Sequence, residues 1–370
     1  MDTASTVDTV HEVRRWLWSG DVRPILAFAE LDARDGRNVS DTIGGARLRL
    51  KGTVGLADGL TAGARLAGRC VTDSCDADWY FDPELPQTTG LANGQVTADE
   101  LYVHFSRPGK FDLTIGRQQI RSILRAGVFF RSLNQVDSNN TRITWTDGLH
   151  FTTRRGKGWE IDATAQYNSP DGSGGIRRGP LDFSPGKARV SYGIFSENLD
   201  AFGPIVQRAL AVSYLPGALL KDGDVNGRRE DYLGVVGRVA ARWPQRAEGF
   251  RFRAGLEVGY APQVPTATGA GIDGDVGKFA WNVTASLMDV LPGHSVGINY
   301  ANTRAGWLLS PNFPDNEESF EVRWLWRSSY FPPVDARIRW RQDIERAVDS
   351  NQRRESVEAF LRLTWQFGGA

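Results

Sequence analysis

The sequence predicts an all-β fold, a transmembrane antiparallel β-barrel of about 16 strands. Extended segments with one apolar and one polar face follow one another from residue 21 to the end of the chain. This is the period-two pattern of strands that separate two environments. Short turns alternate with longer polar loops between the segments, and the last segment, 355–367, ends in the aromatic residue Phe367. No soluble β fold requires such alternation through a whole chain, so the barrel is the preferred fold.

Composition agrees with this fold class and excludes others. The chain has 370 residues and a mean hydropathy of −0.36, and none of its apolar runs reaches the roughly 18–20 residues of a membrane-spanning helix. Low hydropathy is compatible with a membrane barrel because the lumen side of each strand is polar. Lysine plus arginine and aspartate plus glutamate both total 44, so the formal net charge is zero. This balance argues against nucleic-acid binding.

The N-terminal stretch differs from the rest of the chain. Residues 6–18 carry apolar side chains at three- and four-residue spacing, and Gly20 is placed to end a helix. We therefore expect residues 1–20 to form a leader with a short helix at the periplasmic mouth or in the pore. Residues 21–370 are expected to form a single barrel. A flexible leader without a helix is the alternative.

Two features bear on the compartment. No secretory signal follows Met1, which fits a cytosolic protein and also a mature exported protein whose signal was replaced by a start methionine. The barrel pattern favours the second. Cys70 and Cys75 lie in one predicted loop, and their proximity favours a local disulfide in an oxidising compartment. Two free thiols are the alternative, and the lack of a nearby histidine argues against a metal site.

Sixteen extended segments can be marked from residue 21 onward, each close to the roughly 9–11 residues that cross a bilayer at a tilt. They are 21–34, 46–56, 60–70, 96–106, 111–119, 141–154, 159–169, 186–197, 205–217, 231–243, 250–261, 278–290, 294–304, 317–330, 335–345 and 355–367. Short turns follow the even-numbered segments, and longer polar loops follow most odd-numbered ones. An even strand number places both ends of the barrel on the periplasmic side. About 14 or 18 strands also fit, and Pro24 leaves the start of the first strand open.

Alternate residues of each segment are predicted to point to opposite faces of the barrel wall, and each of these two sets of positions is called a parity. The apolar parity faces lipid, with aromatic residues near the segment ends as in interface girdles. The opposite parity faces the lumen and is unevenly charged. Its basic positions are Arg47, Arg49, Lys51, Arg238, Arg242, Arg251, Arg253, Arg323, Arg327, Arg337, Arg339, Arg341 and Arg362. Its acidic positions, expected on the opposing wall, are Glu100, Asp112, Glu160 and Asp162.

A basic wall that faces an acidic wall would create a transverse field across a narrow pore. Such a field orients dipolar solutes and favours anions along the arginine side. The alternative is that these side chains only provide the polar surface that any barrel lumen needs. The zero net charge of the chain weakens the case for anion preference without removing it.

Loop 120–140 is the best candidate for a constriction of the pore. It is rich in apolar residues such as Phe129, too rich for an exposed extracellular loop. Folding inward would bury these residues against the wall and present Arg121, Arg125 and Arg131 to the pore. Packing of the loop against other loops or a partner is the alternative.

The sequence gives little support for a metal site or an enzyme. Asp222, Asp224 and Asn226 match the first half of a calcium loop, but Leu233 stands where the bidentate glutamate is expected. An ordinary Asp/Gly turn is the preferred interpretation, structural calcium is the alternative, and no other cofactor is expected. The histidines are scattered and no nucleophile motif such as G-x-S-x-G is present, so we predict no enzymatic activity.

Residues 99–149 carry a family resemblance. The segment 99–103 is similar to the strand that precedes a G-R-Q motif, found here at 116–118, and arginines follow at Arg125 and Arg131. In these residues the chain resembles the alginate-export and carboxylate-specific porin families of outer membranes. The resemblance implies a monomeric barrel with an arginine-lined, loop-constricted pore.

The chain departs from these families at two places, Arg23-Pro24 in the first strand and the residues 368–370 that follow Phe367. Phe367 itself resembles the C-terminal signal that the barrel-assembly machinery reads in such families. That machinery, outer-membrane lipid and lipopolysaccharide, and a small anionic solute are the expected partners. We expect the barrel to be a monomer or a trimer.

These observations lead to a functional prediction. We expect a porin in the outer membrane of a Gram-negative bacterium, through which small anionic or carboxylate solutes diffuse without chemical change. An exporter of an anionic polysaccharide of the alginate type is the first alternative, and a structural barrel that scaffolds a surface complex is the second. The residues expected to guide the anion are Arg117, Arg121, Arg125, Arg131, Arg337, Arg339 and Arg341.

Overall fold

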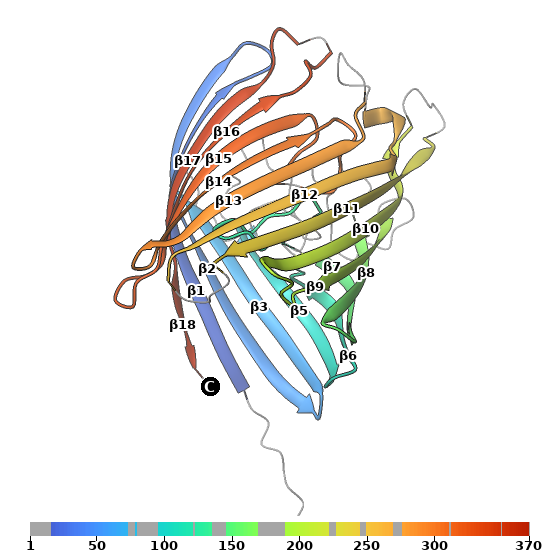
Figure 1. Ribbon diagram of the computed structural model, residues 1–370, viewed down its shortest axis with the longest axis vertical. Coiled ribbons are helices and arrows are strands. Elements are labelled where there is room, and N and C mark those ends of the chain that lie inside the picture. Colours follow the sequence, from blue (N-terminus) through green and yellow to red (C-terminus); the bar gives the residue numbers. More distant parts are fainter. Residues whose placement is uncertain are drawn as a thin grey trace, which may run out of the picture.

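A computed structural model shows the arrangement of most of the chain (Figure 1). The residues that it describes are 16–72, 78–79, 95–120, 123–134, 146–168, 189–221, 227–244, 249–268, 276–310, 312–348 and 350–369. Their wall strands form one closed antiparallel β-barrel, in which each strand pairs with its neighbours along the chain and the first strand pairs with the last. Among these residues no helix has the length and hydropathy needed to cross a membrane.

The barrel wall has sixteen strands when β17 and β18 are counted as one interrupted strand. The wall strands are β1 (Trp16–Asp32), β2 (Asn38–Ala57), β3 (Leu60–Val71), β5 (Gln95–Arg107), β6 (Phe111–Gln118), β7 (Thr146–Arg155), β8 (Trp159–Asn168), β9 (Arg189–Asn198), β10 (Ile205–Leu220), β11 (Arg229–Trp243), β12 (Arg251–Gln263), β13 (Phe279–Leu291), β14 (His294–Thr303), β15 (Glu317–Trp326), β16 (Val334–Asp343), β17 (Glu355–Leu363) and β18 (Trp365–Gly369). The predicted fold class is confirmed, and every predicted segment overlaps one wall strand. Two short elements were not predicted: β4 (Asp78–Trp79), which pairs with β5, and a 3-10 helix, η1 (Thr266–Thr268).

β1 closes the barrel by pairing with β2 on one side and with β17 and β18 on the other. Ile25 pairs with Arg362 and Val22 pairs with Trp365, so the seam is interrupted beside Pro24. Proline has no N–H to donate to a ladder, and a local break in pairing accommodates it. The predicted pairing of the last segment with the first is confirmed, and Figure 1 shows the start of β1 and the end of β18 at the same end of the barrel.

The predicted N-terminal helix is wrong for its last residues, because β1 already begins at Trp16. Trp16 and Trp18 are exposed and continue, at period two, the outward apolar positions of Leu26 and Phe28. The alternation of exposed apolar residues therefore continues through residues 16–18, and it prevails over the three- and four-residue spacing that suggested a helix. Residues 1–15 lie outside the described part of the chain.

Gly20 belongs to β1 and does not end a helix. It pairs with Phe367 of β18, and a Cβ atom at position 20 would lie 2.5 Å from the Phe367 ring and 2.6 Å from the backbone oxygen of Arg49. Glycine is therefore the residue that leaves room for the ring. The same ring lies beside Trp18, with 6.2 Å between the ring centroids. The terminal aromatic residue thus packs across the seam that closes the barrel.

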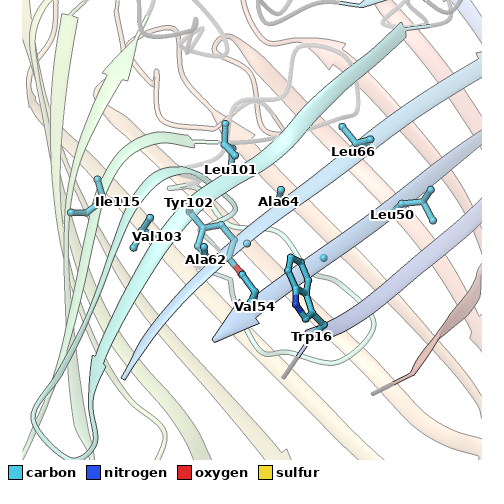
Figure 2. Close-up of a pocket in the computed structure, with 12 residues that line it drawn as sticks. Trp16, Leu50, Val54, Ala62, Ala64, Leu66, Leu101, Tyr102, Val103 and Ile115 are labelled. Atoms are coloured by element: carbon cyan, nitrogen blue, oxygen red, sulfur yellow. The ribbon is translucent and has the colours of Figure 1, made fainter. Parts of the chain in front are cut away.

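The outward side chains of the wall are apolar, as predicted, and on one side they form a groove. The groove has a volume of about 580 Å³ and crosses the outer face of β1, β2, β3, β5 and β6 (Figure 2). Small residues, Gly52, Ala62 and Ala64, lie among larger ones and create the hollow. The larger residues are Trp16, Leu50, Val54, Leu66, Leu101, Val103 and Ile115. A surface of this kind matches hydrocarbon better than water.

Candidate functional site

The segment 123–134, which follows β6, lies inside the barrel against the strands β10–β15. The backbone N–H of Arg125 donates to Gln207 Oε1 at 2.7 Å on β10, and that of Val128 donates to Ser286 Oγ at 3.3 Å on β13. Further along, Ser132 Oγ donates to the β12 carboxylate of Glu257 at 2.7 Å. The predicted inward fold of this loop is therefore confirmed over the described residues.

Apolar packing on small wall residues explains why the segment 123–134 folds inward. Leu124 and Ala126 are buried against Ala240, and a Cβ atom added at Gly255 would lie 2.5 Å from Ala126 Cβ. Val128 and Phe129 form a second buried cluster with side chains of β13 and β15. Burial of this apolar surface offsets the entropy of ordering the loop.

Phe130 is an exception in the segment 123–134, because its ring remains exposed. The guanidinium of Arg323 on β15 lies 5.5 Å from the centre of this ring, within the range of a cation–π contact. The exposed ring and the arginine therefore meet where the loop faces the charged strands of the wall.

A second loop, 304–316 between β14 and β15, also folds into the lumen, and the sequence pattern did not predict it. Trp307 is fully buried and donates from Nε1 to the backbone oxygen of Leu133 at 3.0 Å. Ser310 Oγ donates to the backbone oxygen of Ser132 at 2.8 Å. The run Trp307-Leu308-Leu309 could have predicted this inward fold, since it is too apolar for an exposed loop.

The two loops together cover the inner face of β9–β14. One continuous buried cluster joins Leu133, Trp307 and Phe313 of the loops to apolar residues on these six strands. Many inner positions of the strands are small or apolar there, and a Cβ atom at Gly259 would lie 2.4 Å from the Trp307 ring. The loops therefore narrow the lumen from this side and leave the charged strands as the other wall.

The predicted basic positions Arg47, Arg49, Arg323, Arg337, Arg339, Arg341 and Arg362 gather on β15–β17 and β2, and we call them the arginine-rich wall. Carboxylates that were not predicted lie between them. Glu321 of β15 is 2.6 Å from Arg131 of the loop and 3.8 Å from Arg337. Glu358 of β17 is 2.6 Å from Arg339 and 3.7 Å from both Arg337 and Arg341.

Carboxylates of the arginine-rich wall are shared in the same way elsewhere. Asp335 pairs with Arg323 and Arg362, Asp99 with Arg49 and Arg65, and Asp21 with Arg23 and Arg47. Each of these acids therefore serves two or three guanidinium groups, so the described part of the wall keeps an excess of positive charge. The sequence did contain a sign of these wall carboxylates. Glu317 and Glu321 alternate with their neighbours in the same way as Arg323, so all three point inward from one strand.

The predicted loop and strand arginines do not all reach the open lumen. Arg117 is buried and forms a bidentate ion pair with Asp147, in which Nε donates to Oδ1 at 2.9 Å and Nη2 donates to Oδ2 at 3.0 Å. The expectation that Arg117 faces the pore is therefore wrong. Arg131 is buried in its pair with Glu321. Arg125 stays 47% exposed, 3.3 Å from Glu197. Arg121 lies outside the described residues.

One of the predicted acidic residues lies on the basic side. Glu100 of β5 is 2.7 Å from Lys51 and 2.7 Å from Arg65, so its assignment to an opposing acidic wall is wrong. The register of β3 and β5 shifts between Arg65 and Leu66 and skips Asp99. This bulge turns both Asp99 and Glu100 toward Arg65, which the strict alternation used for the sequence could not show.

Asp112, Glu160 and Asp162, on β6 and β8, form what we call the acidic patch. Asp162 is 2.8 Å from His150 Nε2 and accepts a hydrogen bond from Thr152 Oγ1 at 2.5 Å. Asp112 accepts from Ser106 Oγ at 2.5 Å, and Glu160 pairs with Arg154 at 3.1 Å. Uncharged hydroxyl groups donate to two of these carboxylates, and Glu160 is the one paired with a described arginine, so the patch is acidic.

The remaining predicted sites are described only in part. Cys70 of β3 is disulfide-bonded, and Cys75, the other cysteine of the sequence, lies outside the described residues. Asp222, Asp224 and Asn226 of the calcium candidate also lie outside them. Within the described ranges no group of three histidine, cysteine or acidic side chains could hold a metal ion.

Comparison with known proteins settles the type of barrel. The sequence matches no protein-family model and no curated protein. Solved structures do align. The anion-selective porin from Comamonas acidovorans aligns with a TM-score of 0.53 and 12% identity over 95% of this chain and 100% of that chain. Acinetobacter baumannii OccAB3 aligns with a TM-score of 0.56 and 8% identity over 95% and 99%, and Pseudomonas aeruginosa OccK8 (OprE) with 0.53 and 10% over 96% and 98%. The fold is a porin fold.

At these identities the likeness is one of fold, and the predicted porin resemblance is confirmed at that level. Within this porin fold the described lumen has three surfaces: the two inward loops over β9–β14, the arginine-rich wall, and the acidic patch. Charged and apolar groups therefore face the described part of the lumen on different sides.

Proposed function

We propose that this chain is an outer-membrane porin through which small solutes diffuse, with a preference for anions and carboxylates. The observation that carries the proposal is the segment 123–134, which folds inside a closed barrel and is ion-paired through Arg131 to the arginine-rich wall. Guanidinium groups replace the hydration of a passing anion, and a narrowed lumen brings the anion close to them. One structural neighbour, the porin from Comamonas acidovorans, is itself anion-selective, which agrees with this preference.

The sharing of carboxylates supports anion preference over a merely polar lumen. Glu321 and Glu358 together face the ladder Arg337, Arg339 and Arg341 as well as Arg131. Arg339 Nη1 and the Nε atoms of all three ladder arginines are buried and have no hydrogen-bond partner, and Arg341 Nε lies 3.4 Å from Glu317 Oε1. The N–H groups of the ladder outnumber the carboxylate oxygens that face them, so an anion that reaches the ladder meets an excess of donors.

The inward loops also bear on the alternatives. An exporter of an anionic polysaccharide would use the same arginines but needs room for a polymer, whereas two loops occupy the lumen over β9–β14. This favours small solutes. A structural scaffold would need no conducting path. We expect the barrel to work in a membrane of outer-membrane lipid and lipopolysaccharide, as a monomer or trimer.

Planar-bilayer recording of the purified protein tests the proposal. In a potassium chloride gradient, the reversal potential should have the sign of an anion-selective channel, and its size should fall as the salt concentration rises because salt screens the wall. A reversal potential of the opposite sign would contradict anion preference. An absence of any conductance in correctly folded protein would favour the scaffold.

A further inference from the structure

A separate group of arginines lies inside the barrel at the short-turn ends of β11 and β12. Arg242 and Arg253 are directly opposite each other in the register of these two strands. Both occupy inward positions, because Arg238 and Ala240 on β11 and Glu257 on β12, at the same parities, are buried inside the barrel. None of this group belongs to the arginine-rich wall.

Arg253 is half-buried, and arginines predominate among the charges around it. Those with the largest effect are three arginines, Arg251, Arg242 and Arg327, and one carboxylate, Asp289. That carboxylate forms an ion pair with Arg251. Arg253 has no ion pair among the described residues, and its Nε atom is buried without a hydrogen-bond partner. Like charges directly opposite each other on paired strands destabilise the pair, so an anion between them would relieve the repulsion.

The position of Arg242 and Arg253 along the strands relates them to the constriction. Gly255 is the next inward position of β12 after Arg253, and a Cβ atom there would lie 2.5 Å from Ala126 of the inward loop. Ala240, the next inward position of β11 after Arg242, packs against the same loop. The two arginines therefore lie immediately on the short-turn side of the constriction, the periplasmic side in barrels of this type.

We propose that Arg253 and Arg242 together bind a doubly charged oxyanion at this mouth of the lumen, with inorganic phosphate as the simplest example. Each guanidinium offers two parallel N–H groups, which match two oxygen atoms of a phosphate or carboxylate group. A chloride ion cannot accept such paired bonds and should bind more weakly. The inference rests on the proposed function only in that the oxyanion reaches the site through an open lumen.

Phosphate inhibition of chloride current through the full-length protein in planar bilayers tests this site. Phosphate added at constant ionic strength should reduce the chloride conductance in a saturable way. Arg253→Gln should raise the phosphate concentration for half-maximal inhibition at least tenfold, about 1.4 kcal/mol in binding free energy. Arg253→Lys should give a smaller increase, because it keeps the charge and loses the paired donors.

Arg154→Gln is the matched control. Arg154 is also near a short turn, on β7, but it is paired with Glu160 at 3.1 Å, and its replacement should change the half-inhibiting concentration less than twofold. Equal inhibition in the wild type and in Arg253→Gln would overturn the inference, as would the absence of inhibition in a channel that conducts chloride. Heat-modified migration on gels verifies that each variant forms the folded barrel.

Equilibrium dialysis of labelled phosphate against the detergent-solubilised barrel separates this inference from the proposed function. Arg253-dependent phosphate binding supports the site even if the channel proves cation-selective or does not conduct. An anion-selective channel that binds no phosphate through Arg253 overturns the site and leaves the proposed function standing.

Discussion

Glu257 is the single residue on which the inward loop depends most. Its side chain is fully buried and accepts four hydrogen bonds: from Ser132 Oγ at 2.7 Å, Leu133 N at 3.0 Å, Arg238 Nε at 2.5 Å and Asn282 Nδ2 at 3.0 Å. Glu257 shares the parity of Arg251 and Arg253, which were predicted to face the lumen, but no sequence pattern indicated that a distant loop would reach it. A contact between residues more than a hundred positions apart leaves no local pattern to detect.

Glu257→Gln should destabilise the barrel and loosen the loop. The change removes the charge that compensates Arg238 in a buried site and weakens the bonds to Ser132 and Leu133. Loss of one partner of a buried ion pair costs roughly 3–5 kcal/mol, so the free energy of unfolding in detergent should fall by about that amount. Single-channel current should also become noisier. Glu160→Gln, in an exposed pair, should cost less than about 1 kcal/mol, and equal effects of the two changes would contradict this role.

Asp315 predicts a pH dependence for the 304–316 loop. Burial raises the pKa of its carboxyl group to about 6, against the opposing charges of Arg34 and Arg354. The folded loop therefore holds this proton at pH values where an unfolded chain, with a pKa of about 3.9, has released it. The stabilising contribution is complete below about pH 4 and is lost as the pH rises through about 6. The unfolding midpoint should fall over this range in the wild type, and a variant with Asp315→Asn should lack that part of the slope.

At the scale of elements, the strands were predictable and the inward loops only partly so. Period-two alternation is a local property, and it located each wall strand because every strand has lipid on one side and the lumen on the other. It failed where geometry departs from strict alternation, as at the Asp99 bulge. The helix expected over 6–18 is wrong for residues 16–18, which belong to β1, because a stretch of apolar residues fits both periods. Loop apolarity identified the 123–134 segment, but its partners on β10–β15 could not be inferred.

The seam between β1 and β18 gives a prediction at the same scale. Gly20→Val would place side-chain carbons where the Phe367 ring and the Arg49 backbone oxygen lie, within 2.6 Å of Cβ, and the backbone cannot yield without opening the seam. We expect a lower temperature of heat-modified migration for this variant. Gly52→Val on β2 is the matched control, because nothing lies within 4 Å of a Cβ atom there. Similar losses in both variants would show that the close packing at Gly20 is unimportant.

For the whole molecule, charge is balanced in number and unbalanced in space. Basic and acidic residues each total 44, yet carboxylates of the arginine-rich wall are shared by two or three guanidinium groups. The acidic patch on β6 and β8 compensates some of this excess at a different part of the lumen. Net charge is therefore a poor guide to the electric field inside the barrel, which depends on where the charges lie.

Neutralising the ladder tests whether this imbalance controls permeation. Replacement of Arg337, Arg339 and Arg341 by glutamine together would leave Glu321 and Glu358 without three of their partners, so the local charge would change from positive to negative. The reversal potential in a salt gradient should shift toward cation selectivity, with the ratio of chloride to potassium permeability falling several-fold. A charge-balanced variant that also carries Glu321→Gln and Glu358→Gln should have a reversal potential close to that of the wild type. Unchanged selectivity in the triple variant would place the ladder off the permeation path and move the origin of any anion preference to the arginines at the short-turn mouth.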